Sequence, residues 1–110
     1  MSFSYEIAKY ELYYFGKEAK DENPIAQINL FDDSNRYIGD VFFHRDGQPI
    51  PNNSSGETST PKQAYLKMHE RQLNSVVDML RNEKPCSVYY SNQTYARIYT
   101  GKEPVGKEES

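Results

Sequence analysis

The sequence predicts a single α+β domain: one antiparallel sheet of about five strands in two hairpins, crossed on one face by one long amphipathic helix. Two observations predict these elements. Three segments before position 45 and two after position 85 alternate apolar and polar residues, and the stretch between them repeats apolar residues at three- and four-residue steps. The chain has 110 residues, the commonest domain size, so we expect one core over residues 4–100.

Tyrosine dominates the side chains available to this core. The hydrophobic fraction is 36%, and the chain has ten tyrosines, five phenylalanines and no tryptophan. Aromatic residues fit the half-buried surface of a sheet, and tyrosine can bury its ring while its hydroxyl stays in water. The composition therefore indicates a sheet with a broad aromatic margin.

The first half of the chain predicts three strands. The segments with a period of two are 5–15, 25–31 and 36–44. The run Asp32–Asn35 is rich in residues that form turns, so the second and third strands should form a hairpin. Gly39 interrupts the third strand, which indicates a bulge or close packing beneath the helix.

The helix is predicted between Pro61 and Lys84. Thr60 and Pro61 are residue types favoured at a helix start, and Pro85 ends the pattern. Its apolar face consists of Leu66, His69, Leu73, Val76, Val77 and Leu80. About twenty residues give roughly 30 Å of helix at about 1.5 Å per residue, enough to cross the sheet.

The remaining segments predict a second hairpin and two irregular regions. Residues 86–91 and 95–100 alternate around the turn 92–94. Residues 46–60 have almost no apolar side chains, so we expect a mobile loop. The charged tail 101–110 should fray.

Composition excludes several classes of protein. Cys86 is the only cysteine, so no internal disulfide and no cysteine zinc cluster can form. No apolar run approaches the roughly 20 residues of a membrane helix, and the first residues lack the pattern of a secretory signal. We therefore expect a cytoplasmic protein with no membrane partner.

The net charge of −3 is unevenly distributed. Residues 1–60 carry five basic and ten acidic side chains, whereas residues 61–84 carry five basic and three acidic ones. A uniformly acidic chain would argue against nucleic acid as a partner. This chain argues only mildly against it, because the predicted helix is locally basic.

No polar cluster predicts a catalytic, cofactor-binding or metal site. His44 lies beside Asp46, but a catalytic metal normally takes three protein ligands, and the other histidine, His69, is expected in mid-helix. Cys86 is expected as a small buried thiol, and it could act as a nucleophile only with a histidine in reach. We predict no cofactor.

Three aspartates could suggest cation binding or glycoside chemistry. Asp32 and Asp33 lie in the predicted turn, where aspartate bonds its own backbone. No calcium-loop spacing follows Asp32 and Asp33, and Asp40 lies in a predicted strand. We assign all three a structural role.

The most informative group is aromatic. Tyr89, Tyr95 and Tyr99 alternate with Arg97 on the second hairpin. Tyr5 and Tyr13 have the polar parity of the first strand and could share the same exposed face. Such a group could stack on single-stranded nucleic acid, form a homodimer interface, or simply cover the sheet margin.

The predicted shape favours self-association. One helix covers only one face of a sheet, so the other face must be polar or covered by something else. Phe15, Phe31, Phe42 and Tyr90 have the parity opposite to the main apolar set of their strands. This two-sided apolarity indicates a second copy of the chain.

The predicted order of elements resembles the Pur-alpha/Whirly-type single-stranded-nucleic-acid-binding fold. The tail 103–109 is similar to the ending of small uncharacterised bacterial proteins assigned to that fold. The resemblance implies a curved antiparallel sheet with one crossing helix, dimerisation through the sheet, and nucleic-acid binding. It transfers no binding residue to this chain.

The sequence leaves three functional hypotheses open. The first is a non-enzymatic homodimer, regulatory in role, that acts through protein–protein association. The second is weak binding of single-stranded nucleic acid by the aromatic sheet face of Tyr89, Tyr95, Arg97 and Tyr99. The third is a small-ligand binder or enzyme with a pocket between the helix and the loop 45–60, using His44 and His69.

Overall fold

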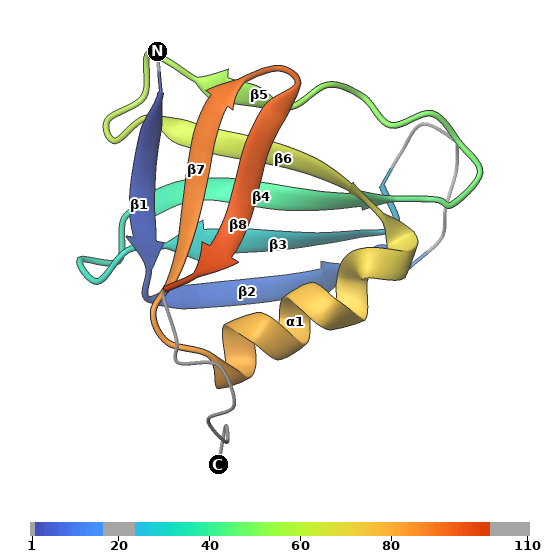
Figure 1. The fold of residues 1–110 in the computed structure, drawn as a ribbon, viewed down its shortest axis with the longest axis horizontal. Coiled ribbons are helices and arrows are strands. Elements are labelled where there is room, and N and C mark those ends of the chain that lie inside the picture. The colour runs from blue at the N-terminus through green and yellow to red at the C-terminus, as the bar shows by residue number, and fades with distance from the viewer. Residues whose placement is uncertain (1, 17–23, 102–110) are drawn as a thin grey trace.

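The computed structural model describes residues 2–16 and 24–101 of the chain (Figure 1). Eight strands and two short helical segments follow one another along it. In chain order they are β1 (Phe3–Ile7), β2 (Lys9–Tyr14), β3 (Ala26–Phe31), β4 (Tyr37–His44), β5 (Ser54–Gly56), β6 (Gln63–His69), the 3-10 turn η1 (Glu70–Gln72), α1 (Leu73–Asn82), β7 (Cys86–Asn92) and β8 (Tyr95–Thr100).

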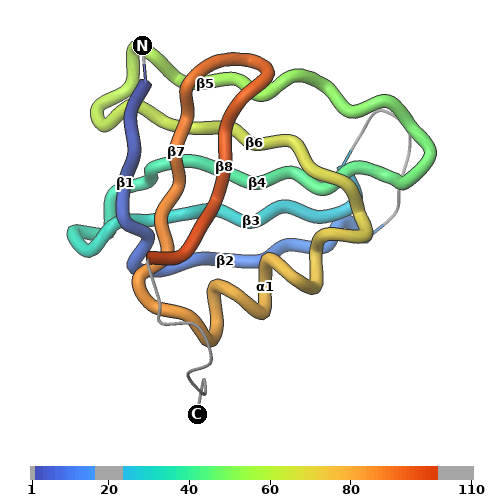
Figure 2. The backbone as a smooth tube through the Cα atoms, in the orientation of Figure 1, coloured from blue at the N-terminus to red at the C-terminus, as the bar shows by residue number. Residues whose placement is uncertain are grey.

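The strands form two sheets, so the prediction of a single sheet is wrong. The larger sheet has the order β2-β3-β4-β6-β5, and the smaller has the order β1-β7-β8. The smaller sheet and α1 lie on the same face of the larger sheet, and β7 and β8 run across its strands (Figures 1 and 2). The described part of the chain is mostly β, and β4 and β6 are a parallel pair within otherwise antiparallel sheets.

The single long helix is also a wrong prediction. Residues 63–69, expected in its first half, form β6, and α1 contains only ten residues. Ala64, Leu66 and Met68 alternate inward from β6, and the first two are buried. The apolar residues of this segment therefore fit the two-residue period of a strand as well as a helical period. Pairing with β4 supplies hydrogen-bond partners for the backbone N–H and C=O groups of β6.

The predicted first strand is divided between the two sheets. Ile7 ends β1 and Lys9 begins β2, with Ala8 between them donating its N–H to the carbonyl of Phe31 at 2.8 Å. The inward parity changes at this point: Ile7 faces the core from β1, and Tyr10 does so from β2. The segment that the sequence predicts as one strand therefore contributes one strand to each sheet.

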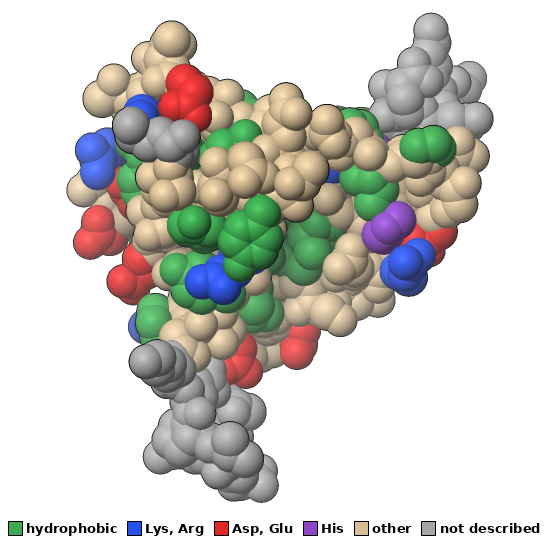
Figure 3. Space-filling model, turned by 45° about the horizontal axis from the view of Figure 1, so that its top comes forward, with side chains coloured by type: hydrophobic (Ala, Val, Ile, Leu, Met, Phe, Trp, Pro, Cys, Tyr) green, Lys and Arg blue, Asp and Glu red, His purple; other side chains and the backbone are tan. Residues whose placement is uncertain are grey.

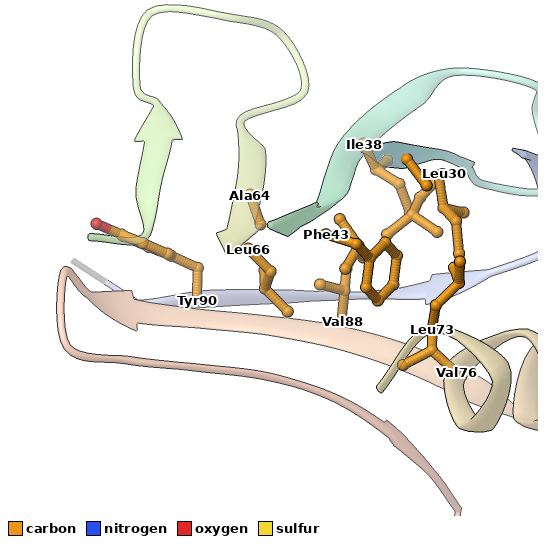
Figure 4. Packing of buried hydrophobic residues seen from close by; sticks show 12 residues of the cluster. Leu30, Ile38, Phe43, Ala64, Leu66, Leu73, Val76, Val88 and Tyr90 are labelled. Carbon is orange, nitrogen blue, oxygen red and sulfur yellow. The ribbon is translucent and has the colours of Figure 1, made fainter. Parts of the chain in front are cut away.

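The core lies between the two sheets and α1 (Figure 4). Its largest fully buried side chains are Phe43, Ile28, Leu30, Ile38, Val41 and Val88. The larger sheet supplies most of them, Val88 comes from β7, and Leu73 and Val76 come from α1. The smaller sheet, together with α1, thus covers the apolar face of the larger sheet, which the sequence predicts to be covered by one long helix.

Both predicted hairpins are confirmed. β3 pairs antiparallel with β4, and β7 pairs antiparallel with β8. Asn35 adopts a positive φ of 66° in the first turn, a conformation that asparagine tolerates. The bulge expected near Gly39 is present as a register shift at Leu30/Phe31, but Gly39 packs against Ala64 of β6 instead of a helix.

The region expected to be a loop contains a strand. β5 lies within residues 46–60 and pairs with the first half of β6. Asn53 donates its backbone N–H to the carbonyl of Gln93 at 3.0 Å, which joins this region to the β7–β8 turn. The predicted fraying tail falls outside the described residues except for Gly101, and no described helix has the length and apolarity to span a bilayer.

No described element covers the other face of the larger sheet. The prediction that this face is apolar is only partly correct, because Phe31 and Phe42 are half-buried there and Tyr90 points into the core. Polar groups join across it: Gln27 donates to Asn29, and Asn29 in turn donates to Glu11. Polar side chains of this face therefore hydrogen-bond to one another.

Candidate functional site

The structure brings the four predicted surface residues together on the outer face of the smaller sheet. Tyr89 of β7 is the register partner of Arg97 of β8, and Tyr95 and Tyr99 flank Arg97 on the same strand. Because side chains two apart on a strand share a face, all four project away from the core. We call this group the tyrosine–arginine surface.

The four side chains contact one another in a defined arrangement. The guanidinium carbon of Arg97 lies 4.6 Å from the ring centroid of Tyr99 and 5.4 Å from that of Tyr89. Arg97 Nη1 also donates to the hydroxyl of Tyr95 at 3.2 Å. The rings of Tyr89 and Tyr95 meet edge to face at 5.8 Å between centroids. These contacts hold the cation against two aromatic rings and the hydroxyl of a third tyrosine.

The tyrosine–arginine surface is exposed to solvent, and Arg97 forms no ion pair with a described carboxylate. Tyr95 is 47% exposed and Arg97 is exposed. Within residues 2–16 and 24–101, Arg36 and Arg71 form ion pairs with aspartates, whereas Arg97 forms none. In the space-filling view, a basic side chain lies beside hydrophobic and aromatic side chains near the middle of this side of the molecule (Figure 3).

Two tyrosines expected on the same face lie elsewhere. Tyr5 points inward from β1, packs on the core and contacts Phe3 at 5.6 Å between ring centroids. Tyr13 belongs to the larger sheet, where its hydroxyl donates to Glu11 at 2.9 Å. The bend at Ala8 separates them, so neither extends the tyrosine–arginine surface.

A pocket of about 280 Å³ lies beside this surface, between β8 and the second half of β6. Ile50, Leu66, Met68, Ala96 and Ile98 supply its apolar lining. Its other described lining residues are Asn53, Lys67, His69, Gln72 and Arg97, so no carboxylate of the described residues lines it. The pocket expected between the helix and the loop 45–60 therefore exists in part, with β8 rather than the helix as a main wall.

The two histidines lie closer together than the sequence predicts. His69 ends β6 and is not in mid-helix, and it is the register partner of His44 on the parallel strand β4. His44 is buried at 4% exposure, and only His69 lines the pocket. Among the described residues no group of three potential metal ligands forms, so the pair lacks the third ligand of a catalytic metal.

The uncovered face of the larger sheet contains a buried acid, Asp40, whose burial the sequence does not predict. Asp40 is 4% exposed and accepts a hydrogen bond from the hydroxyl of Tyr37, while its Oδ1 has no partner within the described part of the chain. Burial raises the pKa of this carboxyl, although the bond from Tyr37 acts in the opposite direction. Alternation along β4 places the Asp40 carboxyl on the face of the sheet opposite the core. Its burial there depends on neighbouring side chains from other strands, which the sequence of β4 does not reveal.

The other polar candidates have structural roles. Asp32 Oδ1 accepts the backbone N–H groups of Ser34 and Arg36 at 3.0 and 2.8 Å, which closes the β3–β4 turn. Asp33 is exposed in the same turn. Cys86 is buried at the start of β7 and lies 3.3 Å from the carbonyl oxygen of Glu83. The prediction of a small buried thiol is confirmed.

Comparisons of the chain with known protein families, with characterised proteins and with solved structures find no match. The resemblance to the Pur-alpha/Whirly-type fold therefore stays a prediction.

Proposed function

We propose that this protein binds single-stranded nucleic acid through the tyrosine–arginine surface. The observation that carries the proposal is the position of Arg97 on an open sheet face, against the rings of Tyr89 and Tyr99 and hydrogen-bonded to the hydroxyl of Tyr95. Sequence-tolerant single-strand binding needs two things, aromatic faces on which bases stack and cations along the backbone path. This surface supplies both within two adjacent strands.

The arrangement favours bases over a purely anionic ligand. Tyr95 is 47% exposed, so part of its ring is accessible to a base. Arg97 has no described carboxylate partner, so it can meet a phosphate without first breaking an ion pair. A surface with one cation should bind weakly and lose affinity as salt is added.

Charge also favours a path for the strand along β8. The register places Glu6 of β1 opposite Ser87 of β7, on the same outer face as Tyr89. A carboxylate there repels phosphates, whereas the outer edge of β8 adjoins the pocket, which no carboxylate of residues 2–16 or 24–101 lines. The bound strand should therefore follow β8 and avoid β1.

A fluorescence anisotropy titration tests the proposal. Labelled single strands of about ten nucleotides, as DNA and as RNA, are added to the protein at low salt. The Tyr95→Ala variant should lose about 1–3 kcal/mol of binding free energy, because one stacking partner is removed. The Tyr14→Ala variant is the matched control, since Tyr14 is 65% exposed on the other sheet.

Two results would contradict the proposal. One is the absence of binding to either nucleic acid at low salt. The other is equal loss of affinity in the Tyr95→Ala and Tyr14→Ala variants, which would indicate a nonspecific effect of removing an exposed ring.

Self-association is a second candidate, favoured by a different observation. Tyr13, Tyr14 and Phe15 are 44%, 65% and 45% exposed at the end of β2, which is an edge strand of the larger sheet. Consecutive exposed rings on an edge that pairs with no further described strand favour pairing with another strand. In this candidate a second copy of the chain supplies that strand, and the resulting homodimer acts in regulation through protein–protein association.

Sedimentation velocity at micromolar concentration tests this candidate. The native chain should sediment above the 12.8 kDa of one copy, and the Tyr14→Ser/Phe15→Ser variant should return to the monomer. A native chain that is monomeric throughout would remove the candidate and leave the nucleic-acid proposal intact.

We place these activities in the cytoplasm. Cys86 is the only cysteine and is a buried, unbridged thiol. A chain that folds without any disulfide suits a reducing compartment. Fractionation of cells that express a tagged full-length chain would test this location.

A further inference from the structure

We infer that the pocket between β6 and β8 holds one nucleobase of the bound strand. This inference rests on the proposed nucleic-acid binding and adds a base-recognition site to it. The tyrosine–arginine surface alone offers stacking and charge, which every base accepts. The pocket adds directional hydrogen-bonding groups, which distinguish bases.

The pocket has the size and lining for a small planar heterocycle. Its volume of about 280 Å³ is just below the range of roughly 300–1,000 Å³ for drug-sized ligands. Ile50, Leu66, Met68, Ala96 and Ile98 provide apolar surface against which a flat ring can pack. A single base has these dimensions, whereas a folded peptide or an acyl chain would need a longer groove.

Two side-chain amides in the pocket are held with their N–H groups available. Among the described strands, β5 pairs with the first half of β6. In the second half of β6, side-chain oxygens accept the backbone N–H groups on that edge. Asn53 Oδ1 accepts the backbone N–H of Lys67 at 2.9 Å, and Gln72 Oε1 accepts that of His69 at 3.0 Å. With each amide oxygen engaged, each amide nitrogen remains a donor without a partner among the described residues.

His69 adds a third polar group. Its Nδ1 is buried, and its side chain faces the backbone N–H of Gln72 in a capping box at the start of η1. Two amide donors and an imidazole match the edge of a base, which presents carbonyl or ring-nitrogen acceptors beside N–H groups. An isolated phosphate would match less well, because Lys67 Nζ bonds Asn52 and Ser54, and Arg97 contacts the tyrosines.

β8 connects the pocket to the tyrosine–arginine surface. Ala96, Arg97 and Ile98 line the pocket, and Tyr95, Arg97 and Tyr99 form the surface. A strand that stacks on Tyr95 can therefore place a neighbouring base over the edge of β8 into the pocket. The geometry assigns selectivity to this one base and general affinity to the tyrosines.

The test compares the affinity of the full chain for single strands of one base type each, in thymine, uracil, cytosine and adenine. The native protein should prefer one base. The Asn53→Asp/Gln72→Glu variant retains the oxygens that accept from Lys67 and His69 but lacks both amide donors. Its affinity for the preferred strand should fall about tenfold and its preference should vanish. The Asn74→Asp/Gln93→Glu variant, changed at exposed positions, controls for the two added charges.

Each outcome decides between the two proposals. If the native chain binds all four strands equally, or the double variant keeps the native preference, the pocket inference is wrong and the proposed function stands. If no strand binds, the proposed function is wrong. In that case, ¹H–¹⁵N NMR titration with uridine and adenosine 5′-monophosphates decides the pocket: shifts at Met68 and Ile98 would support a free-nucleotide site, and unchanged spectra would exclude it.

Discussion

Gly39 of β4 and Ala64 of β6 approach so closely that a Cβ atom on Gly39 would lie 2.1 Å from the carbonyl oxygen of Ala64. The φ of Gly39 is +152°, a conformation that residues with a Cβ rarely adopt. Both constraints arise where a bulged strand meets the parallel strand β6. No side chain other than hydrogen fits without moving the backbone of one strand.

The Gly39→Ala variant should therefore be strongly destabilised. We expect the free energy of unfolding to fall by about 3 kcal/mol or more, because backbone strain and a steric clash act together. Urea unfolding followed by circular dichroism measures the change. The Gly16→Ala variant, where no atom lies within 4 Å of the added Cβ, should change stability by less than about 0.5 kcal/mol.

Leu66 and Leu80 should differ in their contribution to stability, although the sequence assigns both to one helix face. Leu66 is 3% exposed in β6, whereas Leu80 is only partly buried in α1. Leu66→Ala should cost about 2–5 kcal/mol, and Leu80→Ala should cost less. Equal costs in urea unfolding would contradict the assignment of residues 63–69 to a strand.

Asp32 should stabilise the β3–β4 turn in a pH-dependent way. Hydrogen bonds, above all from the backbone of Arg36, lower the pKa of its carboxyl. A lowered folded-state pKa means that this stabilisation is present above the usual aspartate pKa and is lost as pH falls through the folded value. Asp32→Ala should lower the urea midpoint at pH 7 but have little effect in strong acid.

The control for this prediction is Asp33→Ala in the same turn. Asp33 is exposed, so its removal should leave the midpoint nearly unchanged at any pH. A midpoint for Asp32→Ala that lies as far below the native value in strong acid as at pH 7 would show that its charge is not responsible.

Asp40 should have the opposite pH dependence. Burial raises the pKa of its carboxyl, so the folded state holds the proton more tightly than the unfolded state does. Its contribution is therefore most favourable below the usual aspartate pKa and is lost as pH rises through the raised value. Asp40→Asn should be more stable than the native protein at pH 7, and the gain should shrink toward pH 4.

Urea unfolding across this pH range measures the Asp40 effect. The asparagine side chain keeps an oxygen that can accept the bond from Tyr37, so the change mainly removes the buried charge. A variant that is less stable than the native protein at pH 7, with the deficit disappearing in acid, would mean that the carboxylate is ionised and favourably paired.

Arg97 should account for part of the salt dependence of nucleic-acid binding. Each phosphate contact on a single strand contributes about −0.7 to the slope of log Kobs against log salt. Arg97→Gln should therefore reduce the magnitude of this slope by about 0.7. Anisotropy titrations over a range of salt concentrations give the slope, and an unchanged slope would show that Arg97 does not meet a phosphate.

The sequence by itself determined the local features of this protein. Both hairpins lie where the alternation and turn residues predict them, because their strands are adjacent in the chain. The tyrosine–arginine surface follows for the same reason: a hairpin with a period of two places Tyr89, Arg97 and their neighbours on one face. The buried thiol at Cys86 was also predictable from its position at the start of a strand.

Tertiary structure decided the features that depend on distant partners. The apolar residues within 63–69 fit both a helical period and the two-residue period of a strand. They form a strand because they pair with β4. The bend at Ala8, the second sheet, the pocket and the pairing of His44 with His69 all need segments brought together from far apart in the chain. The period of a segment records which of its faces are buried, but the partner that buries them is set by the packing of the whole chain.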